Sequence, residues 1–153
     1  MKFGCLFAVK DIARARSFYE ELFGLKVVDD YGRNITFDCG LSLQEDFDWL
    51  TGINKEDIKF KANNCELSFE SDDFDGFIKK LRSRDDINLL HDIREHPWGQ
   101  HVIRFYDLDD HLIEVGESMK SVVEYFLSKN MSYAEIAQKM DVTVDDVHKM
   151  LNS

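Results

Sequence analysis

The sequence predicts an α+β fold in which a βαβββ plan occurs twice and is followed by a C-terminal helical extension. A strand-length apolar segment precedes an amphipathic helix and three more strand-length segments, and this order returns in the second half of the chain. Laying the first predicted helix on the second superposes apolar positions: Ile12 on Phe74, Ala15 on Phe77 and Tyr19 on Leu81. After Ser118 only helical patterns remain, so the repeat ends there.

The first module spans residues 2–45. Its strand "KFGCLFAV" leads into a helix predicted from Ile12 to Phe23, with Asp11 as the N-cap and Gly24 as a left-handed C-terminal residue. The segments "LKVVDDYG", "NITFDCG" and "LSLQEDF" follow as strands bounded by Gly or Asp. Residues 46–62 are the predicted linker, with a short helix near 46–50.

The second module spans residues 63–117 and completes a predicted domain of residues 1–117. Its strand "CELSFES" precedes a helix that Asp72 or Asp73 can cap. The segments "INLLHDI", "QHVIRFYD" and "HLIEVGE" supply three more strands.

Residues 118–153 form a predicted accessory tail of three helices, spaced as in a helix-turn-helix motif. Ser132 with Glu135 forms a capping box, and Thr143 with Asp146 forms a weaker one. The tail has four Lys, no Arg and five acidic residues, whereas a DNA-reading helix carries basic side chains. We therefore expect the tail to dock on the modules or on a second subunit and not to bind DNA.

The amino-acid composition and net charge exclude several classes of function. A net charge of −11 argues against a nucleic-acid partner. Three cysteines without C-x-x-C spacing predict neither a disulfide framework nor a zinc knuckle, and no long apolar run or signal peptide is present. We expect a cytoplasmic protein with reduced thiols and no membrane association.

One carboxylate stands out. In "HLIEVGE", Glu114 lies between Ile113 and Val115, and side chains alternate between the faces of a strand. A carboxylate between apolar strand residues is seldom buried without a role.

The segments "VKDIARARSFYEELFGL", "FESDDFDGFIKKL" and "PWGQHVIRFYDLDDHLIEVGE" resemble the vicinal oxygen chelate superfamily. This superfamily includes glyoxalase I, bleomycin-resistance proteins, fosfomycin-resistance enzymes and extradiol dioxygenases. The resemblance implies that the paired modules curl into a sheet cup, which in the enzymes holds one divalent metal.

The resemblance places this metal on Glu66 and Glu114. The other ligand positions fall on Gly4, with Cys5 facing the other way, and on Ser42 or Gln44, which are weak ligands. Two carboxylates without a His or Cys ligand at the family positions predict Mg²⁺ or Mn²⁺ at low occupancy. Gln44 or His101 would complete the coordination shell of the metal. The alternative is that Glu66 and Glu114 are strand carboxylates satisfied by Arg104 or by solvent.

Further residues are candidate ligand contacts: Trp98, His101, Arg104, Gln44 and Phe47. Each has a structural alternative, since a lone strand His is more often packed or solvated and Trp98 can plug a turn. We interpret His91, His96 and His111 as surface histidines.

The expected function is that of a glyoxalase or bleomycin-resistance-like protein with a small-molecule cup. It is either a weakly metal-dependent lyase, isomerase or transferase in which Glu114 and Glu66 move a proton, or a non-catalytic protein that sequesters a small, antibiotic-like molecule. A ligand-sensing regulator is a third hypothesis. We expect a homodimer, with the modules pairing within one chain or across two.

Overall fold

The computed structural model describes residues 3–153, which divide into two compact units. The first unit holds the residues up to Cys65 together with Tyr106–Leu112, and the second holds Glu66–Phe105 and Ile113–Ser153. Among the described residues, none of the helices has both the length and the apolarity required to cross a membrane.

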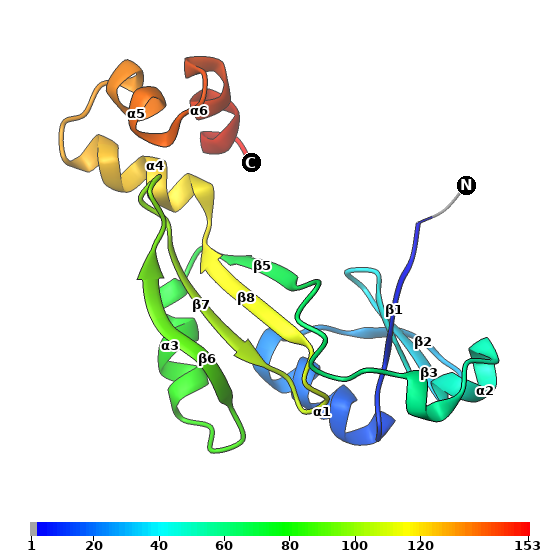
Figure 1. Ribbon diagram of the computed structural model, residues 1–153. Coiled ribbons are helices and arrows are strands. Elements are labelled where there is room, and N and C mark those ends of the chain that lie inside the picture. Colours follow the sequence, from blue (N-terminus) through cyan, green and yellow to red (C-terminus); the bar gives the residue numbers. More distant parts are fainter. Residues whose placement is uncertain (1–2) are drawn as a thin grey trace. The chain divides into compact units, whose positions relative to one another are not determined.

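The first module folds as the sequence predicts. Its elements are β1 (Cys5–Ala8), α1 (Ile12–Phe23), β2 (Val27–Asp30), β3 (Asn34–Phe37) and β4 (Leu41–Gln44) (Figure 1). The sheet order is β1-β4-β3-β2, with β1 parallel to β4 and the other pairs antiparallel. Asp11 accepts a hydrogen bond from Arg14 N at 2.9 Å, and Gly24 ends the helix at a φ of 70°. The linker then carries α2 (Phe47–Thr51) and the short 3₁₀ turn η1 (Lys55–Asp57).

The second module repeats this plan with β5 (Leu67–Ser71), α3 (Phe74–Arg82), β6 (Asn88–Glu95), β7 (His101–Tyr106) and β8 (Leu112–Glu117). Its sheet order, β5-β8-β7-β6, matches that of the first, and β5 runs parallel to β8. Asp73 is the N-cap of α3. The predicted α+β class, with two mixed sheets and C-terminal helices, is confirmed.

Helix α3 covers one face of the second sheet (Figure 1). Phe77 on α3 contacts Phe105 on β7 with ring centroids 6.4 Å apart, and Ile113 and Val115 on β8 are fully buried. Because side chains alternate along a strand, Arg104 and Glu114 lie on the face that α3 leaves uncovered.

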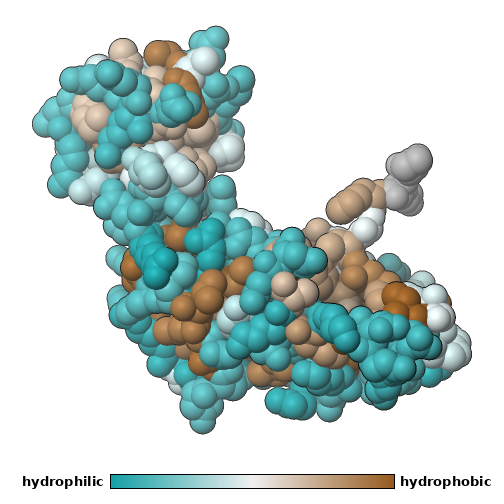
Figure 2. Space-filling view, in the orientation of Figure 1, coloured by the Kyte–Doolittle hydropathy of each residue, from teal (hydrophilic) through white to brown (hydrophobic). Residues whose placement is uncertain are grey.

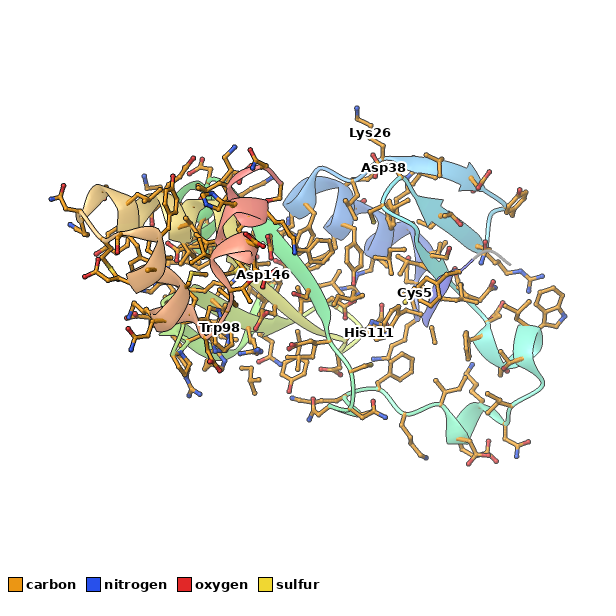
Figure 3. The ribbon with its side chains drawn as sticks, turned by 90° about the horizontal axis from the view of Figure 1, so that it is seen from above. Cys5, Lys26, Asp38, Trp98, His111 and Asp146 are labelled. Atoms are coloured by element: carbon orange, nitrogen blue, oxygen red, sulfur yellow. The ribbon has the colours of Figure 1, made fainter. Side chains whose placement is uncertain are left out.

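The tail forms three helices, α4 (Met119–Ser128), α5 (Tyr133–Met140) and α6 (Val144–Leu151), and both predicted capping boxes are present. The helices share a buried apolar cluster of Val122, Val123, Phe126, Ile136, Ala137, Met140 and Val147. Trp98, from the turn between β6 and β7, packs against this cluster and lies beside the tail in Figure 3. Gly99 has a φ of 92°, and an added Cβ there would collide with the Phe126 ring. The tail therefore packs both on its own core and on the second module.

A buried hydrogen-bond network organises the turn between β7 and β8. Tyr19 donates to Asp107 Oδ2 at 2.7 Å, and His111 Nδ1 lies 2.9 Å from the same oxygen. The other oxygen, Oδ1, accepts from the backbone N–H groups of Asp109 and His111. Asp110 takes a φ of 64°, a conformation that Asp tolerates better than most residues.

The interpretation of His111 as a surface histidine is wrong. Its side chain is only 14% exposed, and its ring meets Phe7 edge-on at 4.8 Å. Burial opposes ionisation of Asp107, but the hydrogen bonds and charge of His111, with the bond from Tyr19, outweigh it and lower the Asp107 pKa. Burial and the nearby Asp107 raise the Tyr19 pKa well above its ordinary value.

The substitution Tyr19→Phe should lower the free energy of unfolding by about 1.5–3 kcal/mol, the usual contribution of a hydrogen bond to a charged group. With its lowered pKa, Asp107 stabilises the fold fully above about pH 4, its ordinary pKa, and this contribution is lost as the pH falls through the folded-state pKa. Loss of the Tyr19 donor raises that folded-state pKa, so acid unfolding should begin at a higher pH. Urea and acid titrations measure both effects. Tyr125→Phe, at a side chain that is 55% exposed, is the control and should change neither; equal behaviour of the two variants would contradict the role given to Tyr19.

The substitution Phe126→Ala should cost about 3–5 kcal/mol, because it opens a cavity in the tail core. It should also loosen the packing of Trp98. In a Trp49→Phe background Trp98 is the sole tryptophan, so its emission should shift to the red. The adjacent, exposed Tyr125→Ala is the control, and an unshifted Trp98 emission in Phe126→Ala would show that the tail does not shield this residue.

Candidate functional site

Arg104 links the two predicted site carboxylates on the uncovered face of the second sheet. Its Nε donates to Glu66 Oε2 at 2.9 Å, and its Nη2 forms a close ion pair with Glu114 Oε2. Glu66 immediately precedes β5, and Glu114 stands opposite Ser68 in the parallel pair of β5 and β8. The structure thus brings Glu66, Glu114 and Arg104 together.

The two carboxylate oxygens of Glu114 accept few hydrogen bonds. Ser68 Oγ lies 3.4 Å from Oε1. Among residues 3–153, the buried Oε2 has no hydrogen-bond partner of regular geometry, so its charge is compensated by the ion pair with Arg104. The hydrogen bond to Glu66 raises the Arg104 pKa; burial opposes this effect and the charge of Glu114 adds to it. Arg104 therefore stays charged across the physiological pH range.

His96 is a neighbour of Glu114 that the sequence interpretation missed. Its Nε2 lies 3.6 Å from Glu114 Oε2, and its ring stacks on Trp98 with centroids 4.2 Å apart and planes 19° from parallel. His96 directly precedes the turn at residues 97–99 that joins β6 to β7. The sequence marks this turn by Pro97 and Gly99 but does not indicate which strand His96 meets.

Trp98 and His101, two further predicted ligand contacts, bond to residues other than Glu66 and Glu114. Trp98 Nε1 donates to Gln100 Oε1 at 3.0 Å, and its ring packs on the tail. His101 Nδ1 lies 2.9 Å from Glu117 Oε2 and belongs to the face of β7 that also carries Phe105, opposite Arg104. The structure therefore does not bring His101 to Glu66 and Glu114.

The first unit contains a separate cavity of about 380 Å³ beside Gln44. It is lined by Tyr31, Arg33, Asn34, Gln44, Trp49 and Leu50. Gln44 is 2% exposed; its Oε1 accepts from Asn34 Nδ2 at 2.9 Å and its Nε2 donates to the backbone oxygen of Glu45. The Arg33 guanidinium lies 4.5 Å from the centre of the Trp49 ring and pairs with Asp46 at 3.1 Å.

Phe47 begins α2 and lines a smaller cavity of about 140 Å³ in the same unit, together with Lys10, Lys55 and Phe60. Lys10 lies over the Phe60 ring at 4.3 Å. Phe47 therefore borders a cavity different from the one beside Gln44.

The donor set of the second module does not fit a divalent metal. Within residues 3–153, no three His, Cys, Asp or Glu side chains are placed so that they could hold a metal ion together. The carboxylates of Glu66 and Glu114 already share the positive charge of Arg104, which would repel a second cation.

The two sheets have corresponding strand orders, β1-β4-β3-β2 and β5-β8-β7-β6, which is the repeated plan expected from the resemblance to the vicinal oxygen chelate class. Residues 3–120 match the model of the glyoxalase-like domain, and the chain belongs to this family. A protein of unknown function from Agrobacterium tumefaciens str. C58 is 35% identical, with a TM-score of 0.67 over 77% of this chain and 94% of that chain.

Two more distant structures share the fold. Lactoylglutathione lyase from Agrobacterium tumefaciens is 22% identical, with a TM-score of 0.58 over 76% of this chain and 92% of that chain. The fosfomycin resistance protein FosX from Mesorhizobium loti is 19% identical, with a TM-score of 0.55 over 76% of this chain and 91% of that chain. The family match ends at residue 120, so most of the tail lies outside it.

The substitution Glu114→Gln should destabilise the protein by about 1–2 kcal/mol, between the values for exposed and buried ion pairs. Two neighbouring carboxylates without a counter-charge would repel each other, and the same change would then be neutral or stabilising. Arg104 reverses the expectation, because the charge of Glu114 is paired. Urea unfolding tests the sign, with the exposed Glu70→Gln on β5 as the control. A stabilised Glu114→Gln protein would mean that repulsion from Glu66 dominates.

Proposed function

We propose that the chain is a small-molecule-binding member of the glyoxalase-like family that sequesters its ligand without transforming it. The observation that carries this proposal is the cavity beside Gln44, which combines a buried amide with exposed aromatic side chains at its rim. Small-molecule sites are typically concave and lined by aromatic side chains, with a few polar groups that set orientation.

The lining indicates the chemistry of the ligand. Tyr31 is 75% exposed and Trp49 is 66% exposed, so the Tyr31 ring and the Trp49 face that Arg33 does not cover can pack against a flat apolar group. Arg33 is already paired with Asp46 and stacked on Trp49, and the net charge of the chain is −11. These charges favour a neutral or cationic ligand over an anion.

The alternative function is a lyase, isomerase or transferase. One observation favours it: His96 and Glu114 lie 3.6 Å apart on the uncovered sheet face, where a histidine and a carboxylate could move a proton. In its metal-dependent form this alternative requires Mg²⁺ or Mn²⁺ on Glu66 and Glu114, which the position of Arg104 disfavours.

A homodimer is part of the proposal. The edge strand β6 carries three exposed apolar side chains, Leu89, Leu90 and Ile93, and Figure 2 shows apolar surface over this part of the second unit. An exposed apolar edge strand is an aggregation hazard unless another surface covers it.

The thiols of Cys5, Cys39 and Cys65 are free, which fits the proposed cytoplasmic location.

Ligand binding can be measured at Trp49 alone in a Trp98→Phe protein, since the chain has only two tryptophans. The probes are bleomycin, a cationic molecule with a flat heteroaromatic tail; fosfomycin, a small anion; and the hemithioacetal of methylglyoxal and glutathione. We expect saturable quenching of Trp49 by bleomycin, none by fosfomycin, and no formation of S-lactoylglutathione.

The matched control is the Trp49→Phe protein, in which Trp98 reports from the tail contact and should not respond. Steady production of S-lactoylglutathione would favour the lyase alternative. Absence of saturable Trp49 quenching by all three probes would count against binding of these ligand classes beside Gln44.

A further inference from the structure

The glyoxalase-like fold and the sequence resemblance lead one to expect a divalent metal on Glu66 and Glu114, yet a side chain of this chain occupies the position between them. Arg104 reaches Glu66 Oε2 with Nε at 2.9 Å and Glu114 Oε2 with Nη2. Both carboxylates are thus held by one planar guanidinium. Arginine suits this task because its donors lie in a rigid fork that can serve two carboxylates at once.

The pairing of the strands brings these three charged residues together, so their contacts follow from the fold. Arg104 lies on β7, Glu114 on the neighbouring β8, and Glu66 at the start of β5 on the other side of β8. The Arg104 side chain is 21% exposed and that of Glu114 is 13% exposed. The Arg104–Glu114 pair is therefore largely buried and is screened less than a surface pair, whereas the Glu66 side chain, just before β5, is 34% exposed.

The guanidinium opposes a metal here because it is already bonded to one oxygen of each carboxylate. Arg104 contributes one positive charge to two carboxylates, so the group carries a net charge of −1 when all three are ionised. A divalent cation between the carboxylates would have to displace the guanidinium or lie beside it. Displacement would leave a partly buried arginine without partners, which is costly.

We propose that Arg104 is the resident cation of this site, so that its guanidinium replaces the divalent metal and keeps metal ions from Glu66 and Glu114. This inference goes beyond the proposed function, because it concerns the charge of the site and holds whether or not the cavity beside Gln44 binds a ligand. It gives Arg104 a positioning role, since it sets the orientation of both carboxylates.

The proposal predicts that removing the guanidinium creates a metal site. In Arg104→Met the aliphatic stem is largely retained, but Glu66 and Glu114 face each other unpaired, with the His96 imidazole beside Glu114. Two carboxylates with one imidazole form a donor set that suits Mn²⁺. Mn²⁺ binding to the full chain is measured by loss of the free-ion electron paramagnetic resonance signal and by calorimetry.

The wild-type protein should show no Mn²⁺ binding that depends on Glu114. Arg104→Met should gain Glu114-dependent Mn²⁺ binding at least about tenfold tighter than any residual Mn²⁺ binding of the wild type, because an adjacent like charge is removed. The gained binding should vanish in Arg104→Met/Glu114→Gln. Arg104→Lys keeps a positive charge at the position and should behave like the wild type.

Two results would overturn the proposal. The first is wild-type Mn²⁺ binding that is lost in Glu114→Gln, which would show that metal and arginine share the site. The second is a folded Arg104→Met protein with no gain in Mn²⁺ binding. Circular dichroism and melting curves establish folding, and Arg104→Gln is the substitute neutral variant if Arg104→Met does not fold. Ligand quenching of Trp49 is scored separately, so failure of this inference and failure of the proposed function are distinguishable.

Discussion

The ion pairs of Arg104 with Glu66 and Glu114 are the interaction on which the chemistry of the second module depends. Strand alternation sends Ile113 and Val115 into the layer under α3, and the same alternation sends Glu114 to the uncovered face. A carboxylate at that place needs a counter-charge, because an unpaired and largely buried charge is strongly unfavourable. Arg104 on the adjacent strand supplies it. The carboxylate pair is therefore one half of a three-group cluster.

The two modules share a fold but carry different chemistry. In each sheet the first strand runs parallel to the last, so Gly4 and Glu66 occupy corresponding places, as do Ser42 and Glu114. The first module has no charge at these positions, and its Ser42 hydroxyl bonds to Thr36 at 2.8 Å. Its distinctive feature is the aromatic cavity beside Gln44. The repeated plan thus carries a charged cluster in one module and a cavity bordered by aromatic side chains in the other.

The tail is tied to the charged cluster through a short chain of contacts inside the second unit. Glu114 neighbours His96, His96 stacks on Trp98, and Trp98 packs on the apolar cluster of α4, α5 and α6. Trp98 was a candidate ligand contact in the sequence; in the structure its ring packs on the tail and its indole N–H donates to Gln100. These contacts form a continuous path from Glu114 to the tail, which is the kind of contact chain that the regulator hypothesis requires.

The sequence by itself determined the repeat, the helices with their caps and the presence of a lone strand carboxylate. These features are local: Asp11, Asp73, Ser132 and Thr143 cap helices through hydrogen bonds that span only three residues. The sequence also placed Glu66, Glu114 and Arg104 as candidates, with neutralisation by Arg104 as one of two alternatives. Only the tertiary structure shows that Arg104 pairs with both carboxylates, because Arg104 and Glu114 lie on neighbouring strands and Glu66 just before a third, and strand pairing is not a local property. The same reason explains His111 and His96, since their burial depends on Asp107, Phe7 and Trp98 meeting them across turns that the sequence pattern does not orient.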